Sequence, residues 1–174
     1  MFGRRAFAVI AMTAVITGAV LWLVAAEPVV ADAAIGSTSN QFSLASPAAD
    51  ITAFDLKDVV QVDVGGVLTP VMRFTMTDAT LHGMTLDQVC RSSHALESSV
   101  PDTDTATLSG SPEIDVTTLS FTYAGTSYTF TPADALPPGL LPLTGAVTSV
   151  SMLGVNLTAD AVRLTGFSTR VAAC

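Results

Sequence analysis

The chain has 174 residues, a hydrophobic fraction of 49% and a formal net charge of −8. Such an acidic protein repels the phosphates of nucleic acids, so we expect no nucleic acid among its partners. The length is that of one domain with a core of its own.

The first part of the chain has the layout of an export signal. Two arginines precede an uncharged apolar stretch at residues 6–26, and a small-x-small site ends at Ala33. This order predicts that residues 1–33 are an export signal of the general secretion route, cut after Ala33. The protein is then secreted or held in the cell envelope. Because the apolar stretch is about long enough to span a bilayer, a retained membrane anchor at residues 6–26 is the alternative.

Residues 34–50 are small and polar, which indicates a leader that enters the domain. The remaining residues, 51–174, are expected to form a single β domain. Removal of residues 1–33 takes away two cations and two acidic residues, so the net charge stays at −8.

Two hairpins are predicted from period-two alternation. Apolar side chains alternate on both sides of Gly65-Gly66 between residues 60 and 76, and on both sides of Ala124-Gly125 between residues 119 and 130. Alternation across a two-residue turn is typical of a β-hairpin, and the abundant Val and Thr suit a pleated surface. We therefore expect an all-β protein, either an antiparallel sandwich or a curved sheet. A partly solenoidal β architecture is the alternative.

Other segments lack this alternation. Residues 91–113 are polar and without a period, which predicts a long surface loop. The prolines of residues 131–143 exclude a central strand there. Thr85 and Gln88 match a capping box, which predicts a short helix beginning at Thr85.

One pattern occurs twice. The segment TDATLHGMTLDQVC, residues 77–90, is similar to TADAVRLTGFSTRVAAC, residues 158–174, and each copy contains Asp-Ala, then a glycine, then a final cysteine. The copies indicate two equivalent strand units, and a β-bulge would absorb their one-residue difference in length. The alternative is chance similarity between glycine-marked bends.

The chain has two cysteines, Cys90 and Cys174. An even count in an exported protein predicts a disulfide, here closing a long loop that would stabilise the fold by about 4 to 5 kcal/mol. We expect the terminal strand to lie against or near the strand that ends at Cys90.

The pentapeptide LPLTG at residues 141–145 matches the motif that cell-wall sortases cleave. A sorting signal also needs an apolar spanning helix after the motif. Here Asn156, Asp160 and Arg163 follow in an alternating pattern instead. We therefore interpret the motif as a proline-containing loop that enters a strand.

Candidate catalytic and metal-binding residues are few. The nucleophile-elbow pattern GxSxG is absent. His82 is expected on a strand surface and His94 in a solvated loop. Asp102 and Asp104 lack the rest of a calcium motif. We expect no enzyme, no metal and no cofactor.

The order of an export signal, a hairpin that leads into the Cys90 segment and a closing Cys174 segment resembles a family of small exported actinobacterial proteins. Some members are labelled cholesterol esterase, but the family has no established function. The resemblance therefore implies an exported protein and supplies no catalytic residue. An esterase would be expected to contain the elbow that this sequence lacks.

These observations favour a non-enzymatic accessory protein of the cell envelope or extracellular space. Its high apolar fraction makes an apolar ligand the candidate cargo, and an envelope lipid or another envelope protein the candidate partner. A secreted hydrolase with an unrecognised site around His94 is the alternative.

Overall fold

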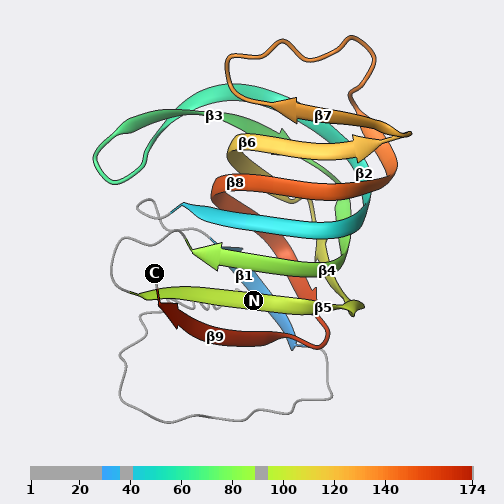
Figure 1. Ribbon diagram of the computed structural model, residues 1–174. Coiled ribbons are helices and arrows are strands. Elements are labelled where there is room, and N and C mark those ends of the chain that lie inside the picture. Colours follow the sequence, from blue (N-terminus) through green and yellow to red (C-terminus); the bar gives the residue numbers. More distant parts are fainter. Residues whose placement is uncertain (1–28, 36–40, 89–93, 174) are drawn as a thin grey trace, which may run out of the picture.

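A computed structural model describes residues 29–35, 41–88 and 94–173 (Figure 1). These residues form nine strands, namely β1 Val29–Ile35, β2 Phe42–Asp63, β3 Leu68–Thr75, β4 Asp78–Gln88, β5 His94–Ser109, β6 Glu113–Tyr123, β7 Thr126–Phe130, β8 Leu143–Leu164 and β9 Ser168–Ala173. Within these ranges there is no helix long and apolar enough to cross a membrane. The predicted all-β class is confirmed.

The strands form one antiparallel sheet that curves back on itself. Its order is β1-β8-β5-β4-β2-β3-β6-β7, with β9 beside β5 and further pairings of β8 with β2 and β6. Strand β2 therefore pairs with β3, β3 with β6, β6 with β8, and β8 again with β2, which gives the ring-like shape in Figure 1. The structure thus takes the curved-sheet form and not the solenoidal alternative.

Strand β8 holds the ring together because both of its edges are paired. On one edge its pairing with β2 runs from Phe54↔Leu143 to Phe42↔Gly154. On the other edge its pairing with β6 extends as far as Glu113. The same residues of β8 are therefore bound on both sides, as in the interior of any sheet.

Both predicted hairpins are confirmed. Gly65 and Gly66 have φ angles of 65° and 86° between β2 and β3, and Ala124 and Gly125 have φ angles of 49° and 81° between β6 and β7. Positive φ at both central residues is the geometry that tight hairpin turns require.

The sequence repeat is a structural repeat. Asp78 of β4 and Ala161 of β8 both pair with Ser109, on opposite edges of β5. Farther along β5, its residues 97–99 pair with β4 on one edge and with β9 on the other edge. Asp78 is thus equivalent to Ala161 and not to Asp160. The extra residue of the second copy lies where the register of β8 with β1 shifts, between Ala159 and Val162.

Each copy of the repeat has a glycine beside the part of β5 where the register between β5 and β4 shifts. The φ angles are 70° at Gly83 and 62° at Gly166. The Asp102 side chain occupies the place of a Cβ at Gly83, and the Asp104 side chain does the same at Gly166. Both positions therefore need glycine for φ and for space.

The prediction of a surface loop at residues 91–113 is wrong, because most of this segment forms β5. Its inward positions include Ser98, Val100, Ala106 and Leu108, all of them buried. Their period of two is interrupted where the register shifts opposite Gly83. Small, polar residues and a broken period concealed the strand.

The short helix expected at Thr85 is also wrong. Thr85 lies in β4 and pairs with Ala45 on one side and Ser99 on the other. Two ladders of backbone hydrogen bonds outweigh one local capping preference.

The β domain begins before residue 51. Strand β1 ends at Ile35 and β2 begins at Phe42, whose side chain is buried. Much of the segment expected to be a polar leader, residues 34–50, therefore belongs to the sheet.

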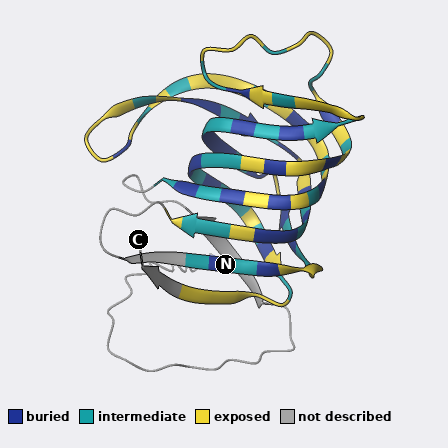
Figure 2. Cartoon of the chain, in the orientation of Figure 1, coloured by how far each residue is buried: buried dark blue, intermediate teal, exposed yellow. Residues whose placement is uncertain are grey.

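The core fills the interior of the ring, and buried and exposed positions alternate along the strands (Figure 2). Inside, the rings of Phe54 and Phe74 stack with their centroids 4.6 Å apart.

The loop expected at residues 131–143 is confirmed, since β8 begins only at Leu143. Leucines of this loop pack against the core. The loop is fastened by Thr131, whose hydrogen bonds to Asp134 lower the pKa of that carboxyl.

Candidate apolar ligand site

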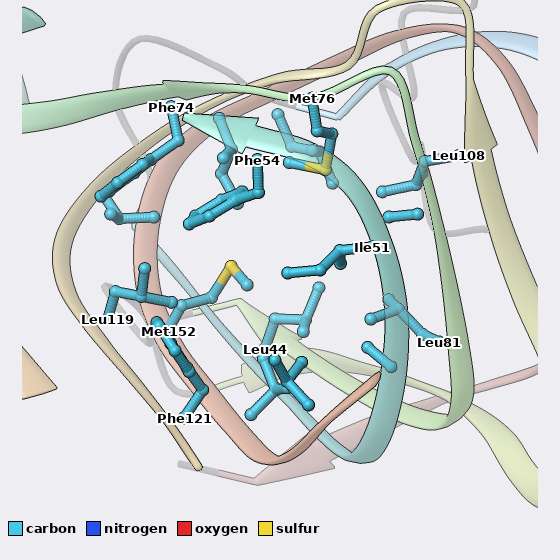
Figure 3. A pocket seen from close by; sticks show the side chains of 17 residues that line it. Leu44, Ile51, Phe54, Phe74, Met76, Leu81, Leu108, Leu119, Phe121 and Met152 are labelled. Atoms are coloured by element: carbon cyan, nitrogen blue, oxygen red, sulfur yellow. The ribbon is translucent and has the colours of Figure 1, made fainter. Parts of the chain in front are cut away.

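A cavity of about 60 Å³ lies inside the ring. Side chains from β2, β3, β4, β5, β6 and β8, together with Met76 between β3 and β4, line it. Figure 3 shows Leu44, Ile51, Leu119 and Met152 pointing into it from different sides. The cavity therefore exists only because the sheet closes on itself.

The lining is entirely hydrophobic, with sulfur only at Met76 and Met152. A water molecule needs two to four polar partners, so a cavity of this kind stays dry. One water-sized group needs about 10 to 15 Å³ on the same measure, so the space holds several such groups. The flexible methionines can adapt to what enters.

Two alanines leave this space open. Ala49 and Ala79 are 2% and 4% exposed, and both line the cavity. They lie on neighbouring strands, where Ala49 pairs with Leu81 and Ala79 pairs with Ile51. A larger side chain at either alanine would point into the cavity.

A second, open groove of about 600 Å³ is lined by residues of β2, β4, β5 and β8. Its polar lining consists of hydroxyl groups and the carboxylate of Asp102. The Ser46 hydroxyl lies 2.7 Å from the carbonyl oxygens of both Gly83 and Ala48, and its single proton is shared between these two acceptors. The described lining of the groove contains neither an aromatic ring nor a cation. The groove therefore selects a class of ligand less clearly than the cavity does.

The strand-surface position expected for His82 is confirmed. His82 lies on β4 with its Nε2 atom 2.7 Å from Asp50 Oδ2, and both side chains are exposed. Among the hydrogen bonds of the described residues, none joins a hydroxyl to the other ring nitrogen of His82.

His94 is the first residue of β5, and its backbone pairs with Ala173 of β9. The loop position expected for His94 is therefore wrong. Asp102 and Asp104 face different glycines. No group of three or more potential metal ligands occurs in the described ranges.

The predicted disulfide partners, Cys90 and Cys174, lie outside the described residues. The strands that lead to them end at Gln88 and Ala173, and both strands pair with β5. The terminal strand β9 therefore lies near β4, as one form of the expectation had it, but not against it, because β5 separates the two strands. The pairing of the two cysteines stays a prediction.

The LPxTG match is a loop that enters a strand, as expected. Leu143 is 2% exposed and belongs to the core. The Ala53 amide donates to Thr144 Oγ1 at 2.9 Å, and Gly145 pairs with Ile51. The burial of Leu143 and the pairing of Gly145 hold the end of the motif in the sheet.

No family model, curated protein or solved structure matches the chain significantly. The functional argument therefore rests on the geometry of the site. Sequence reasoning suggested an apolar ligand from composition, but it did not identify the cavity. Alternation shows which face of a strand is buried, whereas the cavity depends on how six strands converge.

Proposed function

We propose that the protein is an exported, non-enzymatic accessory of the cell envelope or extracellular space that holds an aliphatic chain in its apolar cavity. The observation that carries the proposal is the cavity inside the ring, about 60 Å³ in volume and lined only by hydrophobic side chains. The predicted export signal and the family resemblance support the compartment.

The chemistry of the lining selects the ligand class. A polar headgroup inside the cavity would lose its hydrogen bonds to water without replacement, at a cost of about 1 to 3 kcal/mol or more. Each buried methylene group, in contrast, contributes about 0.8 kcal/mol. The hydrocarbon end of a lipid or fatty acid is therefore favoured inside, with its headgroup outside.

A binding role is favoured over hydrolysis because the lining of the cavity supplies no nucleophile, acid or base. The nearest arrangement to a catalytic one is the exposed pair of His82 and Asp50. A hydrolase would need this pair or His94 to act on a substrate held elsewhere.

The proposal is tested by adding decanoic acid to the delipidated protein, with binding followed by calorimetry and by methyl shifts of the cavity residues in NMR spectra. Ala79→Leu should weaken binding about tenfold or more, because excluding two methylene groups loses about 1.6 kcal/mol. The control is Leu68→Ser, which removes the 71% exposed side chain near the tip of the β2–β3 hairpin.

Loss of binding in Ala79→Leu with normal binding in Leu68→Ser supports the cavity as the site. The reverse result would place the fatty acid on the hairpin and contradict the proposal, as would the absence of binding. An ester-hydrolysis assay on the same samples tests the enzymatic alternative. Activity abolished by His94→Ala would establish a hydrolase instead.

A further inference from the structure

We infer that the export signal is cut after Ala26, upstream of β1, and not after Ala33, so that the exported chain begins at Glu27 and keeps β1 in its sheet. The inference does not depend on what the cavity binds. It concerns which residues belong to the mature domain.

Strand β1 is part of the sheet over its whole length. Its backbone pairs with β8 from Val29↔Leu164 to Ile35↔Leu157. A cut after Ala33 would leave only the last two residues of this strand.

The loss of β1 would open an edge of β8. Strand β1 is the end member of the sheet order and pairs with the final third of β8. Without β1, the backbone N–H and C=O groups on that edge would lack their strand partners. An unpaired, extended edge is a template for association with other chains. The pairing of the sheet therefore favours a mature chain that contains residues 29–35.

The sequence supplies a suitable site before β1. Val24, Ala25 and Ala26 form a small-residue stretch at the end of the apolar segment, directly before Glu27. A signal of 26 residues also falls within the usual length of about 15 to 30 residues, whereas one of 33 exceeds it.

The distance from the membrane also favours Ala26. A signal peptidase acts near the membrane surface, where the apolar segment ends. Ala33 lies seven residues beyond Ala26. In an extended chain this span is about 23 Å. Because the cut precedes folding, β1 cannot shield Ala33, and the position of the site must be set by this distance and by the local sequence.

The test is to express the full chain in an actinobacterial host and to determine the N-terminus of the exported protein by intact mass and N-terminal sequencing. A start at Glu27 is expected. A start at Ala34, or export of an uncut chain, would overturn the inference.

Two matched variants identify the site directly. Ala26→Phe should cause the precursor to accumulate, because a bulky residue replaces the small one before the cut. Ala33→Phe should leave the start at Glu27. Normal processing of Ala26→Phe with failure of Ala33→Phe would contradict the inference.

A second measurement tests the structural reason. Chains produced directly with starts at Glu27 and Ala34 are compared by urea unfolding and by sedimentation over a range of concentrations. The shorter chain should unfold at lower urea concentration or self-associate through the opened edge. Equal midpoints and equal monomeric behaviour would refute the requirement for β1.

Discussion

Arg73 donates two parallel hydrogen bonds to Asp115, from Nε to Oδ1 at 2.7 Å and from Nη2 to Oδ2 at 2.8 Å. The residues are direct cross-strand partners on β3 and β6. The Asp115 side chain is only 2% exposed, and the Arg73 guanidinium is the cation that pairs with it. The hydrogen bond with Asp115 is also the main reason why the pKa of Arg73 is raised.

Arg73→Met should lower the free energy of unfolding by about 3 to 5 kcal/mol, because it leaves the Asp115 carboxylate buried without its partner. The control is Arg170→Met, which breaks the pair with Glu97 at a guanidinium that is 75% exposed and should cost only about 0.2 to 1 kcal/mol. Urea unfolding at neutral pH measures both variants. Equal losses would mean that burial does not distinguish the two pairs.

Two buried alanines should respond in opposite ways to enlargement. Ala79→Val fills part of the cavity and should leave the free energy of unfolding unchanged or raise it by about 0.5 to 2 kcal/mol. Ala106 is 1% exposed but lies outside the cavity lining, so Ala106→Val should cost about 1 to 3 kcal/mol through overpacking. Urea unfolding is again the measurement. A large loss in Ala79→Val would argue against an accessible cavity.

Gly83→Ala should destabilise the protein more than Gly125→Ala. Both glycines have positive φ, at 70° and 81°, so both variants lose the conformational freedom of glycine. Only at Gly83 does a Cβ also meet Asp102, whereas the space beside Gly125 is open. The difference between the two variants in thermal unfolding measures the steric part of the lost stability. Equal losses of stability would show that Asp102 moves aside freely.

The elements that were predicted correctly are those whose signal is local. Gly65-Gly66 and Ala124-Gly125 specify their turns through backbone conformation, and the alternating residues beside them specify the strands. Strand β5 was missed because its period of two is broken at the register shift opposite Gly83 and its buried residues include Ser98. The cavity was missed because Ala49 and Ala79 define a space only when β2 and β4 curve into the ring.

The folded protein should not be a sortase substrate. Leu143 is buried, and Thr144 and Gly145 are held in register beside β2. Incubation with a sortase specific for LPxTG and an oligoglycine acceptor should give no product by mass spectrometry. A linear peptide with the sequence of residues 138–148 is the positive control. A transpeptidation product from the folded chain would contradict the protection of this segment by the burial of Leu143 and the pairing with β2.

The disulfide between Cys90 and Cys174 remains a prediction with a changed geometry. The strands that lead to the two cysteines lie on opposite edges of β5, about 9.6 Å apart, which is farther than a disulfide spans between Cα atoms. Cys174→Ser should lower the free energy of unfolding by about 2 to 5 kcal/mol. Thiol labelling of the unreduced, denatured protein should find no free thiol, and two labelled cysteines per chain would refute the bond.

The double pairing of β8 also determines when the fold can be completed. Its ladder joins Phe42 to Gly154 and Phe54 to Leu143, so the contacts that close the ring connect opposite ends of the chain. Such high contact order slows folding, because loop-closure entropy is lost before the contacts form. A chain that crosses a membrane with its N-terminus first cannot close its core until residues 143–164 have emerged. If the chain is exported as we propose, completion of the fold is delayed until translocation is nearly finished.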